Sequence, residues 1–585
     1  MRISPRAFAR LALPTLALSA LSLAGTLARA AAPVEKSLPA NTIAVIKVDD
    51  VSKLRAAFKA SQFGQLLADP GMKPLKDNIA AKLEDGDKKA KEAVGLTIGE
   101  ILDLPQGPAT FALVAREDAK IPVAGILMAD AGKNEAKMDQ LLDKLTKMAE
   151  KDNGKVATEQ FKGMKLTIIS PPAGDDAGPK VVWAKKGSAY TITTDAEILK
   201  DLISHVDGRT DSIVSTEGYQ AVAKKLGTGS QGMFYIDVAQ VFKLASAAGA
   251  ANGGNAEQIV AQLQLTGLNG LKAIAGSLTF GGEFDSMAKI FINAPQPVQG
   301  LLKIFSMPKV ALKPPAWVPA TATGYQSISW DLDGAYKAIN ELADQFAPGV
   351  LDNVQKQIAG PNGESIDFQK DIFGPLGDRI TLVGDFKKPI TEKSQRTLIG
   401  IALEDTKAFQ ASLAKIFAIT KATPKKREFQ GTVIYDLDLS GLPNADQMQI
   451  DGPVSLAIAK DHIFITTEPT ILEQVLRSGG ASLADSPEYQ AVAKNFPELS
   501  STQSYQKPEE GVRLLYDMLK NGGLLKAIKE QNPNADVDKL KEIVDPSKLP
   551  DFSVIAKYLA PGGGYGLMDD DGVLFTRFTL KKANP

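Results

Sequence analysis

Aspartates that directly follow apolar segments are the residues of this chain whose type and spacing suit acid–base chemistry. They are Asp49, Asp50, Asp130, Asp237, Asp331, Asp333 and Asp405. Two carboxylates held a few ångströms apart form the catalytic pair of a glycoside hydrolase. Each aspartate also stands just before an expected helix, where its side chain accepts hydrogen bonds from free backbone N–H groups. The sequence therefore predicts helix capping, with a carboxylate-dependent hydrolase as the alternative.

Nucleophilic and metal chemistry are restricted by the composition. The chain has no cysteine and two histidines, His205 and His462. A cysteine nucleophile and a Cys/His zinc site are therefore excluded. A Ser-His-Asp triad needs one histidine, but no G-x-S-x-G sequence accompanies either of them. We predict that both histidines occupy surface or turn positions, and we predict no catalytic, metal-binding or cofactor-binding residues.

Two glycine-rich stretches and one acidic run resemble ligand-binding motifs but stand in the wrong context. GTGSQG, at residues 227–232, follows a helical segment and precedes a strand, which is the reverse of a dinucleotide-binding loop. GGGYG, which begins at Gly562, also precedes an expected strand. The aspartates at 569–571 lack the alternate spacing and distant glutamate of a calcium loop. Because Asp571-Gly572 favours a tight turn, we predict a β-hairpin there.

The first thirty residues have the three-part layout of a secretory signal. Arg2, Arg6 and Arg10 precede an apolar run at 11–24, and Ala-Arg-Ala at 28–30 gives the small-x-small pattern of a cleavage site. The apolar run is shorter than the roughly 20 residues of a transmembrane helix. We expect residues 1–30 to be removed and the mature chain, periplasmic or extracellular, to have no transmembrane segment.

The charge balance argues against a nucleic-acid partner. The chain has 67 Lys and Arg against 68 Asp and Glu, and the signal holds four of the arginines, which leaves 63 against 68 and a net charge of −5. A nucleic-acid-binding protein carries a concentrated basic surface instead.

The chain repeats itself along its length. YQAVAK at Tyr219 recurs at Tyr489, an offset of 270 residues. Five further matches keep the same order: LPANT at Leu38 with VPATA at Val318, GPATFALV at Gly107 with GDRITLVG at Gly377, GILMAD at Gly125 with GIALED at Gly400, EQFKG at Glu159 with REFQG at Arg427, and YTITTDAEILKDL at Tyr190 with FITTEPTILEQVL at Phe464. We predict a first repeat over 31–307, a proline-rich linker over 308–317 and a second repeat over 318–585.

The pattern within each repeat predicts the fold class. Residues 42–48 are β-branched and apolar, a helix is expected from Val51, and strands are expected at 108–115 and 122–129. The next helix places apolar side chains on one face: Met138, Leu141, Leu142, Leu145 and Met148. Strand, helix, strand, strand, helix, strand is the split β-α-β order. We predict an α+β protein of two tandem homologous lobes, each a largely antiparallel sheet with amphipathic helices.

Two segments carry a resemblance to a known group. The opening LPANTIAVIKVDD at Leu38, with SQFGQLLADP at 61–70, and the ending from Leu549 resemble exported bacterial proteins grouped as a domain of unknown function. The second repeat lacks the Gln-Leu-Leu element. The resemblance implies no activity, cofactor or catalytic residue, because the group has none assigned.

These observations favour a non-catalytic binding or scaffold protein of the cell envelope, whose partner is an envelope protein or a ligand. We expect a groove between the duplicated lobes as the place for a ligand. The alternatives are the carboxylate-dependent hydrolase and a carrier of an apolar ligand. For the carrier, the stretch GLNGLKAIAGSLTF from Gly267 would line a pocket, unless it packs in the core.

The signal assignment predicts the N-terminus of the exported protein. When the full chain is expressed in a Gram-negative host, we expect the periplasmic product to begin at Ala31, because Ala28 and Ala30 are the small residues that the peptidase accepts. Intact-mass measurement and N-terminal sequencing read this directly. Ala30→Arg should accumulate precursor, whereas wild-type product that retains Met1 would contradict the assignment.

Overall fold

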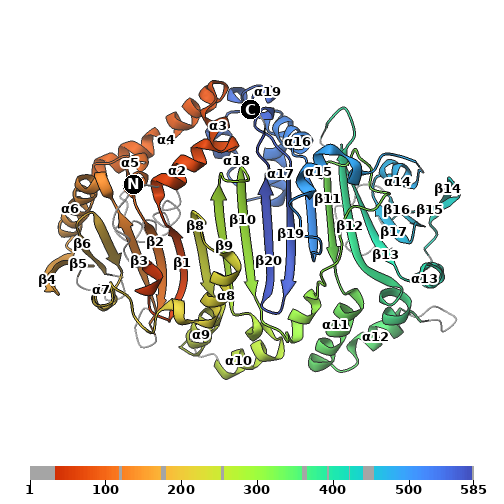
Figure 1. The fold of residues 1–585 in the computed structure, drawn as a ribbon, viewed down its shortest axis with the longest axis horizontal. Helices are drawn as coiled ribbons and strands as arrows, with labels where there is room; N and C mark the ends of the chain where they lie inside the picture. The colour runs from red at the N-terminus through yellow and green to blue at the C-terminus, as the bar shows by residue number, and fades with distance from the viewer. Residues whose placement is uncertain are drawn as a thin grey trace.

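Twenty strands form one open β-sheet that runs the length of the molecule (Figure 1). This computed structural model describes residues 33–116, 122–172, 180–251, 256–358, 365–391, 394–420, 422–438, 453–477 and 479–582. The predicted signal, residues 1–30, lies outside the described residues. We call the elements up to β10 the first lobe and those from β11 onward the second lobe.

The two lobes have the same strand order. From the outer edge to the centre, the first lobe contributes β4 (Lys155–Phe161), β5 (Met164–Ser170), β6 (Val181–Lys186), β7 (Ala189–Thr193), β3 (Val123–Asp130), β2 (Ala109–Ala115), β1 (Thr42–Val48), β8 (Gly232–Asp237), β9 (Ala273–Phe280) and β10 (Ser286–Asn293). The second lobe contributes β14 (Lys425–Phe429), β15 (Thr432–Leu437), β16 (Val454–Ala459), β17 (His462–Thr466), β13 (Gln395–Leu403), β12 (Leu376–Phe386), β11 (Gly324–Ser329), β18 (Thr502–Gln506), β19 (Gly562–Asp569) and β20 (Gly572–Thr579). Every first-lobe strand thus corresponds to the second-lobe strand numbered ten higher. All strands that are neighbours in the sheet are antiparallel. The predicted fold class is confirmed.

Helices join the strands and line two margins of the sheet. The first lobe has α2 (Val51–Ala60), α3 (Gln62–Ala68), α4 (Lys73–Val94), α5 (Ile98–Leu102), α6 (Glu135–Lys151), α7 (Ala196–Ser204), α8 (Glu217–Leu226), α9 (Val238–Ala251) and α10 (Ala256–Leu265). The second has α11 (Leu332–Phe346), α12 (Val350–Gln357), α13 (Thr406–Thr420), α14 (Pro469–Leu476), α15 (Pro487–Ala493), α16 (Glu509–Lys520), α17 (Gly523–Gln531), α18 (Val537–Ile543) and α19 (Phe552–Ala556). In Figure 1, α9–α12 lie along the lower margin, and α3, α4, α16 and α19 lie along the upper margin. The predicted chain order of strand, helix, strand, strand, helix, strand is present. The predicted split β-α-β arrangement is not, because β1 and β2 are direct antiparallel neighbours in the sheet.

The repeated YQAVAK sequence has a packing explanation. In the first lobe Tyr219 of α8 meets Tyr235 of β8 edge to face, with ring centroids 5.2 Å apart. In the second lobe Tyr489 of α15 meets Tyr505 of β18 in the same way, at 5.5 Å. Such an aromatic pair adds about 1 kcal/mol beyond its buried area. GTGSQG forms the connection from α8 to β8, as the sequence predicts.

The lobes meet edge to edge at the strand pair β10–β20. Three alternate pairs of this register share one face of the sheet: Met287–Phe578, Lys289–Thr576 and Phe291–Leu574. Phe291 and Phe578 are both buried, and each pairs with an aliphatic side chain of the other lobe. The pairing therefore has the self-complementary form of a twofold interface, with the axis at Lys289–Thr576. We call this pairing the seam.

The seam corrects the expectation of a groove between the lobes. The lobes do not face one another across a gap, because β10 and β20 exchange backbone hydrogen bonds and make the two sheets continuous. Pairing buries the open hydrogen-bonding edges that both strands would otherwise present to solvent.

The SQFGQLLADP segment supports one end of the seam. The Gln62 backbone N–H donates to Asp285 Oδ1 at 2.7 Å, and its side-chain amide donates to the Leu580 carbonyl at 3.1 Å. The Lys582 N–H donates in return to Gln62 Oε1 at 2.8 Å. Gln62 thus ties α3 of the first lobe to the residues that directly follow the last strand of the second, which accounts for this part of the motif.

The β19–β20 hairpin supports the other end. Asp569 pairs with Gly572, so the predicted hairpin at the aspartate run is confirmed. The Asn293 side-chain amide donates to the Asp571 carbonyl at 2.7 Å, and the Gln296 N–H donates to the Asp570 carbonyl at 2.8 Å. The turn is therefore docked on the end of β10.

Gly572 allows this docking, and its replacement tests the seam. Its φ is +131°, and a Cβ there would lie 2.1 Å from the Ile292 carbonyl oxygen. Gly572→Ala should lower the free energy of unfolding by about 3 kcal/mol, since backbone strain and a clash combine. Gly163→Ala is the matched control: φ is +78° with nothing within 4 Å, so only about 1–2 kcal/mol of backbone strain applies. Urea unfolding measures both variants, and equal losses would contradict the docked turn.

Candidate functional site

Five of the seven strand-end aspartates cap helical turns, as predicted. Their carboxylates accept hydrogen bonds from backbone N–H groups two or three residues ahead: Asp50 from Lys53 (3.1 Å), Asp130 from Gly132 (2.9 Å), Asp237 from Gln240 (2.9 Å), Asp331 from Gly334 (2.7 Å) and Asp405 from Ala408 (2.9 Å). These carboxylates therefore hold the helix starts at the ends of the strands.

The capping prediction is wrong for Asp49 and Asp333. Asp49 forms an ion pair with Lys47, with 3.1 Å between Nζ and Oδ1. Asp333 lies inside α11 and pairs with Lys337 one turn later, at 2.5 Å. The helix begins one residue before Asp333, so its side chain points along the helix surface, where an i to i+4 ion pair forms.

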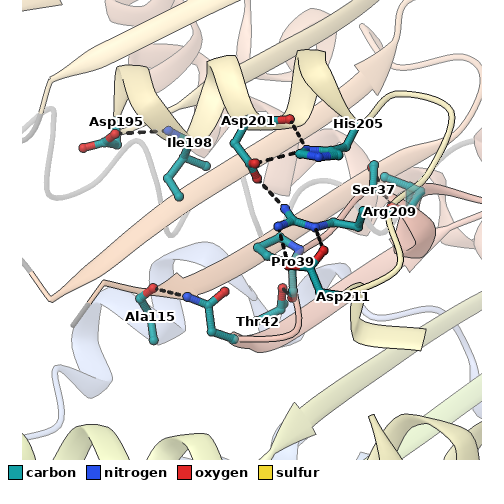
Figure 2. Close-up of polar contacts among 12 residues, drawn as sticks. Ser37, Pro39, Thr42, Ala115, Asp195, Ile198, Asp201, His205, Arg209 and Asp211 are labelled. Carbon is teal, nitrogen blue, oxygen red and sulfur yellow. Dashed lines mark hydrogen bonds and ion pairs between the residues drawn. The ribbon is translucent and has the colours of Figure 1, made fainter. Parts of the chain in front are cut away.

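His205 ends α7 within a polar network (Figure 2). Its Nδ1 lies 2.9 Å from the Asp201 carbonyl oxygen and 3.1 Å from Asp201 Oδ1. Arg209 bridges Asp201 at 2.5 Å and both oxygens of Asp211 at 2.7 Å, and this hydrogen bonding lowers the pKa of Asp211 to about 2. Among the described residues, no serine hydroxyl is hydrogen-bonded to the imidazole. His205 therefore stabilises a turn, as predicted.

His462 follows a turn, as predicted, but its ring is partly buried. Its Nδ1 lies 2.7 Å from the Lys460 carbonyl oxygen. The ring stacks on Phe464 at 5.7 Å and meets the edge of Trp317 at 5.3 Å. Burial lowers the pKa of the imidazole. The residue belongs to an aromatic cluster of the second lobe rather than to the open surface.

A hollow of about 640 Å³ in the second lobe collects acidic side chains. Its lining residues are Asp331, Asp333, Asp367, Gln369, Lys370, Gly374, Leu376, Asp378 and Glu404. We call it the acidic hollow. Partial desolvation in the hollow, together with the negative charges of Asp331 and Glu404, raises the pKa of Asp378, although its side chain stays largely exposed. Within the described ranges, no group of three or more Asp, Glu or His side chains is arranged to hold a metal ion.

The acidic hollow is not repeated in the first lobe. The sequence matches align Asp378 with Pro108 and Glu404 with Ala129, neither of which can titrate. Two of the acids also have structural partners: Asp331 caps α11, and Asp367 accepts from the Lys370 N–H at 2.9 Å. Duplication has preserved the scaffold here without preserving the carboxylates.

One face of the central sheet carries none of the side chains of the two main hydrophobic clusters, although α2 packs over its β1–β2 end at Val48 and Ala109. The core side chains of β10 and β20 are Met287, Phe291, Leu574 and Phe578. Successive side chains of a strand point to opposite faces. Ile290 and Arg577 therefore lie on the other face, where both are exposed, Ile290 by 45%. We call this the open face.

Apolar side chains cross the open face in register. Phe111, Ile46, Phe234, Gly276, Ile290 and Phe575 pair in this order across β2, β1, β8, β9, β10 and β20. We call them the apolar row. With neighbouring strands about 4.8 Å apart, the row is roughly 24 Å long and crosses the seam. A Cβ on Gly276 would lie 2.4 Å from the Phe234 ring, so this glycine lets the ring lie flat on the sheet.

Part of this arrangement could be predicted from the sequence. GLNGLKAIAGSLTF was predicted to pack in the core or to line a pocket, and one face of β9 packs in the core. Ala273 and Ala275 are buried in the core, whereas Ile274 and Leu278 point to the open face. GGGYG, expected before a strand, instead begins β19 itself. The register across the seam decides which face each residue occupies, and it is not visible in any local pattern.

Comparisons with known proteins place the chain without assigning an activity. A family model described as "Protein of unknown function (DUF3352)" matches residues 106–281 and 348–536, one region in each lobe. No curated protein and no solved structure matches significantly. In the ranges that the structure describes, no helix combines the length and apolar character needed to cross a bilayer.

The raised pKa of Asp378 predicts a pH-dependent gain on its removal. A carboxyl whose pKa is raised from its ordinary value of 3.8 by folding destabilises the native state when it is charged. Asp378→Asn should therefore be more stable than wild type near pH 7. The gain should be below about 1 kcal/mol because the group is solvent-exposed.

At low pH the stability difference between Asp378→Asn and wild type should disappear. As the pH falls through the raised pKa and below 3.8, the wild-type carboxyl becomes neutral and the gain of Asp378→Asn should vanish. Asp85→Asn, at an exposed position on α4, is the control and should lack the gain. Thermal unfolding at several pH values measures this. A variant less stable than wild type at neutral pH would refute the electrostatic account of the hollow.

Proposed function

We propose that this chain, which belongs to the DUF3352 family of unknown function, is an exported, non-catalytic binding protein of the cell envelope. Its binding surface is the open face, and the observation that carries the proposal is the apolar row. The row spans five strands of the first lobe and crosses the seam to β20 of the second, on the face opposite the two main hydrophobic clusters. Ile290 is 45% exposed, and Ile46, Phe111, Phe234 and Phe575 are half-buried. Apolar side chains that stay accessible in one contiguous row mark interaction sites on proteins.

The rigidity of the strands that carry the apolar row supports a binding role. The side chains of the apolar row project from paired strands, whose backbone positions are fixed by the ladder on both sides. A surface built on strands is held more firmly than one built on loops. In Figure 1 the strands β10 and β20 run between the helices of the two margins.

The acidic residues support a role other than catalysis. Five strand-end aspartates are engaged in capping, and Asp333 is engaged with Lys337.

The export step rests on the signal pattern of residues 1–30, and the two repeats at 31–307 and 318–585 make up the mature protein in this proposal.

A carboxylate-dependent hydrolase is the second candidate, and one observation favours it. In the acidic hollow the pKa of Asp378 is raised, and Asp331 lies close enough to contribute to that shift. A carboxyl group whose pKa is raised by burial and neighbouring negative charge is a feature of acid–base catalytic sites. Turnover of a glycoside, ester or peptide substrate that is lost in Asp378→Asn would favour this candidate over binding.

An uncharged fluorescent probe, N-phenyl-1-naphthylamine, tests the proposed binding surface. We expect saturable binding to the purified mature protein, and about tenfold weaker binding to Ile290→Gln, because a polar group replaces apolar surface at the centre of the row. Phe63→Gln is the matched control, since Phe63 is 57% exposed on α3 and is not part of the row. Fluorescence titration measures all three proteins. Equal weakening in both variants, or no saturable binding, would contradict the proposal.

A further inference from the structure

We infer that the open face binds a fatty acid, with the alkyl chain on the apolar row and the carboxylate on Arg577. This inference rests on the proposed function, because it uses the same face as the binding surface. It adds the chemical class of the ligand. The evidence is the position, the environment and the free hydrogen-bonding capacity of one guanidinium group.

Arg577 stands on the open face among small side chains. In the register of the sheet it pairs with Ala288 of β10 on one side and with Gly564 of β19 on the other. Neither neighbour covers it, and Arg577 is exposed. A ligand can therefore approach the guanidinium from the open side of the sheet.

The guanidinium retains most of its hydrogen-bonding capacity. It donates from Nη2 to Gln506 Oε1 at 2.6 Å. Within the part of the chain that the structure describes, no carboxylate forms an ion pair with it. An arginine has five N–H donors in a planar fork that matches a carboxylate in two parallel bonds. Arg577 thus offers a cationic fork with no anion of this protein to neutralise it.

The seam places this charge next to the apolar row. Arg577 directly precedes Phe578, and Ile290 directly precedes Phe291, so the two residues occupy equivalent places about the twofold axis. One lobe supplies an aliphatic side chain where the other supplies a cation. Ile290 pairs with Phe575, two residues from Arg577, so Ile290 and Arg577 are diagonal neighbours about 7–8 Å apart.

The single cation Arg577 beside the apolar row specifies the ligand chemistry. The ligand needs one negative charge and an uncharged chain, because the apolar row carries no charged residue. A membrane surface is recognised by clusters of several basic residues, and an added peptide strand pairs with a sheet edge rather than with a face. A fatty acid presents one carboxylate and one alkyl chain, which meets both requirements.

Paired ligands that differ only in their headgroup test the inference. Laurate and 1-dodecanol, each below its aggregation concentration at pH 8, would displace the naphthylamine probe from the purified mature protein. We expect wild type to bind laurate at least tenfold more tightly than dodecanol, because the carboxylate gains charge-assisted hydrogen bonds from Arg577. Arg577→Gln should lose this preference and keep its affinity for dodecanol, and Arg577→Lys should retain part of the preference.

Control variants separate failure of the inference from failure of the proposed function. Arg513→Gln, at an exposed arginine on α16, should leave the preference for laurate unchanged. If Ile290→Gln weakens probe binding but wild type binds laurate and dodecanol equally, the fatty-acid inference is overturned and the binding surface stands. If no apolar compound binds, both fail. Sedimentation with phosphatidylcholine vesicles that depends on Ile290 and not on Arg577 would identify a membrane surface and also overturn the inference.

Discussion

Backbone pairing between β10 and β20 is the constraint on which the rest of the molecule depends. Each lobe alone would end in an exposed edge strand, with Phe291 or Phe578 at the margin of its core. Pairing satisfies both edges and aligns the faces of the two sheets, so that one apolar row extends across strands of both lobes. Gln62 at one end and the β19–β20 turn at the other hold this register. The open face exists as one surface because the seam fixes it.

Duplication explains both the symmetry and its local loss. The tyrosine pair beneath the YQAVAK helix is kept in both lobes, but the neighbouring polar groups differ. In the first lobe buried Glu35 accepts from Tyr219 at 2.9 Å and pairs with Lys47; burial opposes ionisation of Glu35, yet Lys47 keeps its pKa lowered. In the second lobe the equivalent Tyr489 hydroxyl donates to Gln503 Oε1 at 3.1 Å. The buried tyrosine hydroxyl therefore has a different partner in each copy, and Ile290 and Arg577 have diverged in the same way on the open face.

The sequence predicted what depends on local patterns and repeats. The α+β class, the duplicated order, five aspartate caps and the hairpin at Asp571-Gly572 all follow from neighbouring residues or from matched segments. The seam could not be predicted, because Ser286 and Thr579 are distant in sequence and nothing local specifies their register. The expected groove was wrong for this reason. Which side chains of β10 and β20 point to which face of the sheet, and hence the exposure of Ile290 and Arg577, can be determined only once the strands are paired.

Hydrogen exchange at the backbone amides of β10 and β20 tests the central claim most directly. The account predicts that amides bonded across the seam, from Ser286–Asn293 and Gly572–Thr579, are as strongly protected as those of the interior strands β1 and β9. It also predicts that the two strands lose protection together when the protein is destabilised. Rapid exchange of the β10 amides that face β20, alongside protected amides in β9, would show that the lobes end in separate edges and would contradict a single continuous face.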